Sequence, residues 1–173
     1  MRLTTLLLSA ILVAPLPSVA QPYAIGSSQP AQASTAKLSP SKNILVGDST
    51  TAVFGGWGPS FCAKHAKHML ACVNMARHGR STTSYIREGS WDVALAEMKS
   101  GGYAKTYLTI QFGHNDQPGK ADAVEPETGF AANLRRYVTE ARAAGAIPIL
   151  VTPLTRRNFV DGKLVDTLGP YAE

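Results

Sequence analysis

The sequence predicts an α/β fold built on a parallel sheet, and three observations support this prediction. Short runs of apolar, β-favouring residues recur along the chain, at 43–46, 70–76, 106–112 and 147–151. Segments with helical spacing of apolar residues separate these runs. Glycine-rich or polar turns follow them, as is usual where strands end. Strands that alternate with helices form parallel sheets, so all strand carboxyl ends should lie along one edge.

The first 20 residues have the features of a secretory signal peptide. Arg2 precedes an apolar run at 3–13, and small residues occupy the last and third-last positions. The run is shorter than the roughly 20 residues of a membrane-spanning helix, so we expect a secreted or periplasmic protein with no membrane span. Residues 21–42 are rich in Gln, Ser, Ala and Pro, which predicts a flexible leader. Residues 43–173 are then expected to form one domain.

The composition is that of an ordinary soluble globular protein. Of the 173 residues, 45% are hydrophobic and 17% are charged. The net charge of +5 comes from scattered basic residues, with Arg135-Arg136 and Arg156-Arg157 as the only adjacent pairs. Because no basic stripe rich in aromatic residues occurs, we expect no nucleic-acid partner. A mildly basic surface is compatible with an acidic polysaccharide, and we expect a monomer.

The first predicted strand, Asn43 to Val46, ends in Gly47, and Ser49 follows where a strand would hand over to a helix. Ligands of open α/β sheets bind outside the carboxyl ends of the strands, so a hydroxyl at this position lies where chemistry usually occurs. The alternative is that Ser49 only caps the next helix. Pro59 suits the first turn of a helix that runs to about Met69.

The next two strands also end in polar turns. The strand at 70–76 leads into the turn at 77–82, and the strand at 106–112 leads into the turn at 113–116. Between them, Ser90 is a plausible cap for a helix. Its apolar residues recur at helical spacing: Trp91, Ala94, Leu95 and Met98.

The last part of the domain is predicted as a helix, a strand and a hairpin. One helical face collects Phe130, Leu134, Tyr137, Val138 and Ala141. Gly145 ends that helix, and the strand at 147–151 follows. The segment 158–165 predicts a small hairpin around Asp161-Gly162. Pro170 could open one more helix before the sequence ends at Glu173.

Three strand-end turns carry residue types suited to ester hydrolysis. A serine that attacks an ester carbonyl creates an oxyanion, which backbone N–H groups and an asparagine amide commonly stabilise. Ser49, Gly79 and Asn115 supply these groups after three consecutive strands. Individually, Gly79 is also compatible with an ordinary turn and Asn115 with a loop residue that bridges backbone groups. Their joint occurrence along one sheet edge favours a shared site.

The motifs that contain these residues resemble a known family. The blocks Gly47-Asp48-Ser49-Thr50, Gly79-Arg80-Ser81 and Gly113-His114-Asn115-Asp116 are similar to the first three sequence blocks of the SGNH (GDSL-like) hydrolases. The segments 56–58, 79–82 and 111–116 are most similar to the rhamnogalacturonan acetylesterase branch. The resemblance covers about residues 43 to 171.

The resemblance implies a flavodoxin-like, three-layer fold and ester hydrolysis without a metal or other cofactor. Ser49 would be the nucleophile and would contribute its own N–H to the oxyanion hole. The Gly79 N–H and the Asn115 amide would complete that hole. The implied substrate is an acetyl ester on pectin-type rhamnogalacturonan.

One family feature is missing. In the family, the fourth sequence block supplies an Asp-x-x-His pair, whereas this sequence has no such motif and no histidine after His114. A serine hydroxyl is a poor nucleophile without a base. We therefore expect a chain that is truncated at its C-terminus, with little or no activity; the alternative base is His114. A different class of function is a non-catalytic carbohydrate-binding pseudoenzyme. A third alternative keeps the chemistry but acts on a lipid, a thioester or another sugar ester.

Several other residues are candidates for substrate contact. Trp57, in a glycine-rich loop, could stack on a sugar ring, whereas Trp91 follows a helical apolar pattern and is expected in the core. Arg80 could meet a galacturonate carboxylate or brace its own turn. His114 could contact substrate from the third turn.

The two cysteines could form a disulfide, because export permits one. Cys62 and Cys72 lie on a predicted helix and the following strand. Together with His65 and His68 they imitate a metal-binding set. The spacing of these residues places them on different faces of the helix, so we favour the disulfide and expect no metal site.

Overall fold

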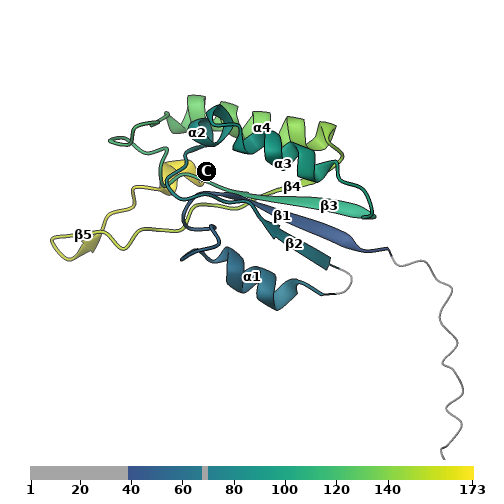
Figure 1. The fold of residues 1–173 in the computed structure, drawn as a ribbon. Coiled ribbons are helices and arrows are strands. Elements are labelled where there is room, and N and C mark those ends of the chain that lie inside the picture. The colour runs from purple at the N-terminus through teal and green to yellow at the C-terminus, as the bar shows by residue number, and fades with distance from the viewer. Residues whose placement is uncertain (1–38, 68–69) are drawn as a thin grey trace, which may run out of the picture. The chain divides into compact units, whose positions relative to one another are not determined.

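The computed structural model describes residues 39–67 and 70–173, so the predicted signal peptide and most of the predicted leader lie outside the described residues. Four parallel strands form one sheet in the order β2-β1-β3-β4 (Figure 1). These strands are β1 (Ser41–Gly47), β2 (Leu70–Asn74), β3 (Lys105–Gln111) and β4 (Ile147–Leu150). The order is that of the first four strands of a flavodoxin-like sheet.

Helices cover both faces of the sheet, which confirms the predicted three-layer α/β fold (Figure 1). Helix α1 (Gly58–His65) lies on one face. The other face carries α2 (Thr82–Arg87), α3 (Ser90–Met98) and α4 (Ala131–Ala143). Because β1 pairs with β2 on one side and β3 on the other, it is the central strand of this arrangement.

The main core lies between the sheet and α2–α4. Ile44 and Leu108 of the two central strands are fully buried there, together with Trp91 and Tyr137 of the helices. The Trp91 and Tyr137 rings meet edge to face with centroids 4.5 Å apart, a favoured geometry for aromatic pairs. The Trp91 indole donates to Glu140. The prediction that Trp91 is a core residue is therefore confirmed.

Strand β1 begins two residues earlier than predicted, so Ser41 and Lys42 belong to the sheet and not to the leader. Lys42 is completely buried, and its ammonium group donates to the carbonyl and carboxylate of Glu97 and to the Ser100 hydroxyl. A buried lysine is tolerated only when its charge and donors are matched in this way. That compensation explains why a charged residue can stand within the central strand.

Two predictions about helices were wrong in extent or position. Turns follow β1 where a handover to a helix was expected at Ser49. Helix α1 has Pro59 in its first turn, as predicted, but ends at His65 and not near Met69. The 77–82 turn leads at once into α2, which the sequence interpretation missed because the helix is only six residues long. Ser81 and Ser84 cap its start by reciprocal side-chain and backbone hydrogen bonds.

The C-terminal part follows the prediction with local differences. A π-helical turn (Pro126–Phe130) precedes α4. The predicted hairpin forms between β5 (Phe159–Val160) and β6 (Lys163–Leu164). Asp161 and Gly162 both have positive φ, as a two-residue turn of this kind requires. A 3₁₀ turn (Gly169–Tyr171) replaces the helix expected at Pro170.

Candidate active site

The turn after β1 is held in shape by Asp48. Its backbone carbonyl accepts hydrogen bonds from the N–H groups of Thr51 and Ala52. Its Oδ1 atom accepts from the Thr50 N–H at 2.8 Å and the Thr50 hydroxyl at 2.7 Å. Ser49 sits within this turn and is half-buried. Short acidic side chains in turns commonly bond the local backbone in this way.

Gly47 allows the turn to pack tightly against β3. In the parallel register Gly47 lies opposite Gln111. A Cβ atom at position 47 would collide with the Gln111 carbonyl oxygen and would lie 2.9 Å from the Thr51 hydroxyl. Glycine is therefore required here for close approach, because only a residue without a side chain fits.

The sheet topology brings the three predicted turns together. Ser49 follows β1, Gly79 follows β2 and Asn115 follows β3, and these strands are neighbours. In flavodoxin-like sheets the ligand site lies where the strand order reverses, between β1 and β3. The Asn115 amide donates to the Arg80 carbonyl at 3.0 Å, which joins the second and third turns directly.

Gly79, the predicted oxyanion donor of the second turn, has a backbone conformation that favours glycine. It is exposed, and its φ of +73° lies in the left-handed region that favours glycine. The Arg77 N–H donates to the Gly47 carbonyl at 2.9 Å, so the chain leaving β2 stays beside β1 until just before Gly79.

A hydrogen-bond hub at Gln111 connects the turn after β1 to the rest of the sheet. Its Oε1 atom accepts from the Thr50 hydroxyl at 3.0 Å, the Thr51 hydroxyl at 2.9 Å and the Trp57 indole at 2.6 Å. Its Nε2 atom donates to the Thr152 carbonyl at 2.8 Å. Gln111 is almost fully buried, so one side chain ties the end of β3 to both flanking segments.

Trp57 lies against the Gln111 hub. Its indole N–H is used by Gln111, and its ring meets Phe61 edge to face with centroids 5.7 Å apart. Both contacts turn Trp57 inward, against the β1–β3 end of the sheet. The arrangement favours a structural role over the sugar stacking predicted from the sequence.

Asp48 and His114 form a buried pair beside Ser49. The Asp48 Oδ2 and His114 Nδ1 atoms are 3.6 Å apart, and among the described residues neither has a hydrogen-bond partner. The His114 side chain is 10% exposed. Its carbonyl accepts from the Arg156 guanidinium at 3.0 Å. The buried position of the His114 side chain argues against the predicted substrate contact.

Asp116 connects the third turn to α2. Its carboxylate accepts from the N–H and hydroxyl of Thr82 and from the Gly113 N–H at 3.1 Å. Burial raises the pKa of Asp116 to about 6, and the nearby Asp48 carboxylate also raises it, while these three hydrogen bonds lower it. The Tyr171 hydroxyl donates to the Asp116 carbonyl at 3.2 Å. This network holds the turn that contains Asn115.

Arg80 braces its own turn. Its guanidinium donates to the Glu88 carboxylate at 2.8 Å and to the His78 carbonyl at 2.8 Å. Of the two roles predicted for Arg80, the contacts match bracing, since the carboxylate partner is already supplied from within the chain.

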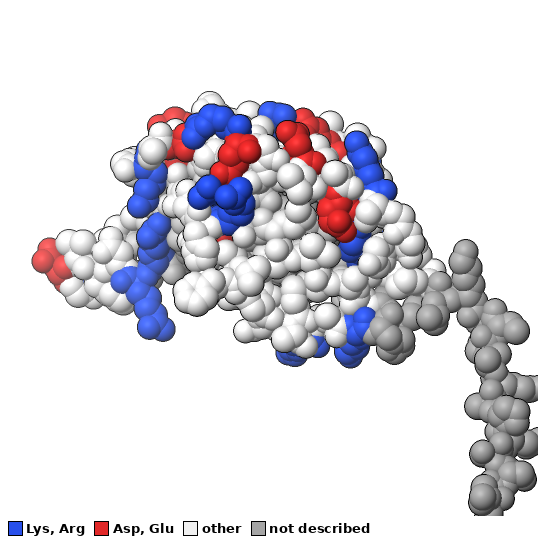
Figure 2. Space-filling model, viewed as in Figure 1, with Lys and Arg blue, Asp and Glu red and all other residues white. Residues whose placement is uncertain are grey.

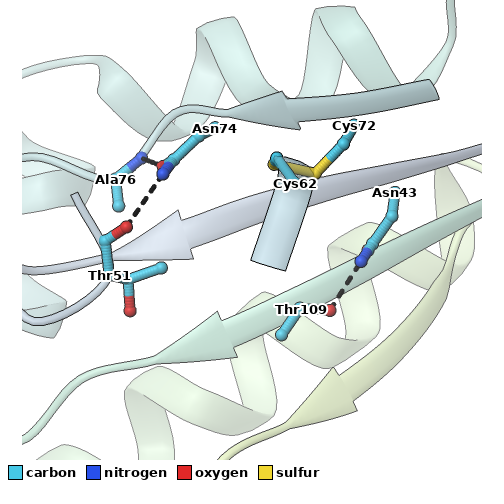
Figure 3. Close-up of a disulfide and its surroundings, with 7 residues drawn as sticks. All are labelled: Asn43, Thr51, Cys62, Cys72, Asn74, Ala76 and Thr109. Atoms are coloured by element: carbon cyan, nitrogen blue, oxygen red, sulfur yellow. Dashed lines mark hydrogen bonds between the residues drawn. A yellow bond between two sulfur atoms is a disulfide. The ribbon is translucent and has the colours of Figure 1, made fainter. Parts of the chain in front are cut away.

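Cys62 of α1 and Cys72 of β2 form a disulfide (Figure 3). Nearby, the Asn74 amide donates to the Thr51 carbonyl at 2.8 Å, and its oxygen accepts from the Ala76 N–H at 3.1 Å (Figure 3). The disulfide thus fixes α1 to β2, and Asn74 fixes the end of β2 to the turn after β1.

Charged side chains of both signs are interspersed over the helical layer of α2–α4 on the face shown in Figure 2. Among the described residues, Arg87 forms an ion pair with Asp122 and Arg136 forms one with Glu140. Within residues 39–67 and 70–173, no group of three or more His, Cys, Asp or Glu side chains is placed to hold a metal ion. In the same residues no helix is long and apolar enough to cross a membrane.

The sequence did not predict the hydrogen-bonding role of Gln111 or the close approach of the Asp48 and His114 side chains. Gln111 is a polar residue in the buried pattern of β3, and that position was the available signal. Its partners come from three separate segments, which only the parallel register brings together.

Comparisons with known proteins agree with this geometry. Residues 45–172 match the GDSL-like lipase/acylhydrolase family. The rhamnogalacturonan acetylesterase RhgT of Bacillus subtilis is 37% identical over 142 residues, which cover 78% of this chain and 58% of that protein. Another B. subtilis protein, named "Probable rhamnogalacturonan acetylesterase YesY", is 31% identical over 135 residues, which cover 73% and 60%. The chain thus spans about three fifths of the length of these relatives.

Solved structures show the same fold. Protein YxiM of B. subtilis has a TM-score of 0.54 and 25% identity, with 69% of this chain and 34% of that chain covered. A protein assigned to the G-D-S-L lipolytic family from Desulfitobacterium hafniense has a TM-score of 0.56 and 21% identity, with coverage of 76% and 67%.

Proposed function

The chain belongs to the GDSL-like lipase/acylhydrolase family, and on that premise we propose that it is a carboxylic ester hydrolase whose nucleophile is Ser49. The observation that carries the proposal is the meeting of three strand-end turns at the β1–β3 switch point, joined by the Asn115–Arg80 hydrogen bond. The motif-based assignment to the family is confirmed by the comparisons.

In the proposed reaction the Ser49 hydroxyl attacks the ester carbonyl and its proton passes to a base. The carbonyl oxygen becomes an oxyanion, which the N–H groups of Ser49 and Gly79 and the Asn115 amide stabilise. The Asn115 NH₂ group has two hydrogens, and one is held by the Arg80 carbonyl. That bond fixes the plane of the amide, so the second N–H is preorganised for the oxyanion. Loss of one such donor typically lowers turnover about 100-fold to 1,000-fold.

The sequence holds no Asp-x-x-His pair that could remove the proton from Ser49. The Nδ1 atom of His114 faces Asp48 in a buried position. The Nδ1 and Asp48 Oδ2 atoms are 3.6 Å apart and share no hydrogen bond, so the Asp48 carboxylate faces the imidazole without the bond that orients a catalytic histidine. We expect that residues 21–173 alone have little or no turnover, and that robust turnover would identify His114 as the base.

We propose an acetylated rhamnogalacturonan as the substrate, with hydrolysis releasing acetate, and export from the cytoplasm as a secreted or periplasmic protein. The names of the two B. subtilis relatives support the substrate. The features of residues 1–20 support the export.

The test is hydrolysis of 4-nitrophenyl acetate by the full gene product, compared with its Ser49→Ala variant. Ser60→Ala is the matched control, because Ser60 is an exposed serine on α1. We expect Ser49→Ala to abolish hydrolysis and Ser60→Ala to retain it. Equal rates for the wild-type protein and Ser49→Ala would exclude Ser49 as the nucleophile.

A second candidate is a carbohydrate-binding protein without catalysis, favoured by the missing Asp-x-x-His motif. The encoding DNA discriminates between the two. An Asp-x-x-His codon pattern beyond codon 173 in any frame would favour the esterase, while a genuine stop codon would favour the binding protein.

A further inference from the structure

The turn that carries Ser49 also carries an exposed phenyl ring. Phe54 is 84% exposed and its neighbour Val53 is 64% exposed. Single exposed apolar side chains are common on protein surfaces, so the exposure of Phe54 gains meaning from its place in the turn that contains Ser49 and from the ring beside it. Trp57 is not the exposed aromatic of this loop, because Gln111 and Phe61 hold it inward.

The backbone presents Phe54 at the tip of a closed loop. The Trp57 N–H donates to the Thr50 carbonyl at 2.8 Å, which closes the segment between them. Gly55 has a φ of +78°. A Cβ atom at Gly56 would lie 2.6 Å from the Ala52 nitrogen, so the end of the loop packs closely on its start. The loop is therefore tightly folded, and Phe54 stands out from it.

A second exposed ring comes from the neighbouring turn. His78 directly precedes Gly79, is exposed, and has its ring centroid 6.4 Å from that of Phe54 at an interplanar angle of 46°. One ring thus belongs to the nucleophile turn and the other to the turn of the proposed oxyanion donor. The pair flanks the proposed site with two chain segments that are far apart in sequence.

We propose that Phe54 and His78 form a sugar-binding platform, which holds a pyranose ring of the polysaccharide next to the residue that bears the ester. The face of an aromatic ring carries partial negative charge. The C–H groups of a pyranose face carry partial positive charge and match it. The His78 ring nitrogens can bond sugar hydroxyls. The position of the platform beside an ester site rests on the proposed function, whereas sugar binding itself requires no catalysis.

The test is binding of saponified rhamnogalacturonan oligosaccharides to the full chain, measured by calorimetry and by NMR shifts. We expect Phe54→Ala to weaken binding at least about fivefold, a loss in the range of one aromatic contact. Phe54→Tyr should retain binding, since it keeps the ring. Tyr103→Ala is the matched control. Tyr103 is a 38%-exposed aromatic just before the start of β3, at the opposite edge of the sheet, and its loss should leave the affinity unchanged.

The outcomes separate this inference from the proposed function. Absence of oligosaccharide binding, equal affinity of Phe54→Ala and the wild-type chain, or an equal loss in Tyr103→Ala would overturn the platform, whatever the esterase assay shows. Conversely, Phe54-dependent binding together with hydrolysis that does not depend on Ser49 would keep the platform and exclude Ser49 as the nucleophile. The thermal midpoint of Phe54→Ala should match that of the wild type, because the exposed ring contributes little to the core.

Discussion

Replacement of Gln111 by Met tests whether this side chain holds the nucleophile turn. Methionine keeps an unbranched side chain of similar length but can neither accept nor donate the four hydrogen bonds of the amide. The Thr50 hydroxyl keeps Asp48 as a partner, and the exposed Thr152 carbonyl can bind water. The two donors left without a partner are the Thr51 hydroxyl, in a fully buried residue, and the half-buried Trp57 indole.

A buried donor without a partner costs about 1–3 kcal/mol. With two such donors, one of them half-buried, we expect Gln111→Met to lower the free energy of unfolding by about 2–4 kcal/mol. For a domain of this size, 1 kcal/mol corresponds to roughly 3–4 °C in the melting temperature. The assay is therefore urea and thermal unfolding, with an expected decrease of about 6–16 °C in Tm. A Tm within about 2 °C of the wild type would refute the hub.

A double-mutant cycle isolates the contact between Gln111 and Trp57. Trp57→Phe removes the indole donor and keeps an aromatic ring. If the contact is as described, Trp57→Phe should cost about 1 kcal/mol less in the Gln111→Met background than in the wild type. Costs that add within about 0.5 kcal/mol would mean that the two side chains do not interact energetically.

Two further predictions concern the disulfide and the buried carboxylate. The Cys62–Cys72 bridge closes a loop with a sequence separation of 10. The double variant Cys62→Ser, Cys72→Ser should therefore lose about 2–3 kcal/mol of unfolding free energy and unfold at a lower urea concentration. An unchanged urea midpoint would contradict the bridge. The folded chain holds the Asp116 proton up to about pH 6, whereas an unfolded chain releases it near pH 4. Stability should therefore decline by about 3 kcal/mol as the pH rises from about 4 to 6, and Asp116→Asn should remove that decline; parallel pH profiles of unfolding for the two proteins would exclude it.

The sequence was sufficient for the strands and for the blocks of the site because both depend on local patterns. Apolar runs placed four strands within two residues of their observed ends. The short helix α2 escaped the prediction, since six residues with a serine cap carry too little periodicity. The prediction that a helix follows Ser49 directly was wrong, because hydrogen bonds to Asp48 fold the following residues into turns.

The sequence by itself determined the fold class, the order of the strands along the chain and the three motifs that carry Ser49, Gly79 and Asn115. Only the tertiary structure decided which side chains meet between those motifs. The parallel register sets Gly47 opposite Gln111 and turns Trp57 inward to the hub, while Phe54 is left outward beside His78. Such contacts join residues more than twenty positions apart, and their partners depend on strand register and loop closure, which no local pattern of residues specifies.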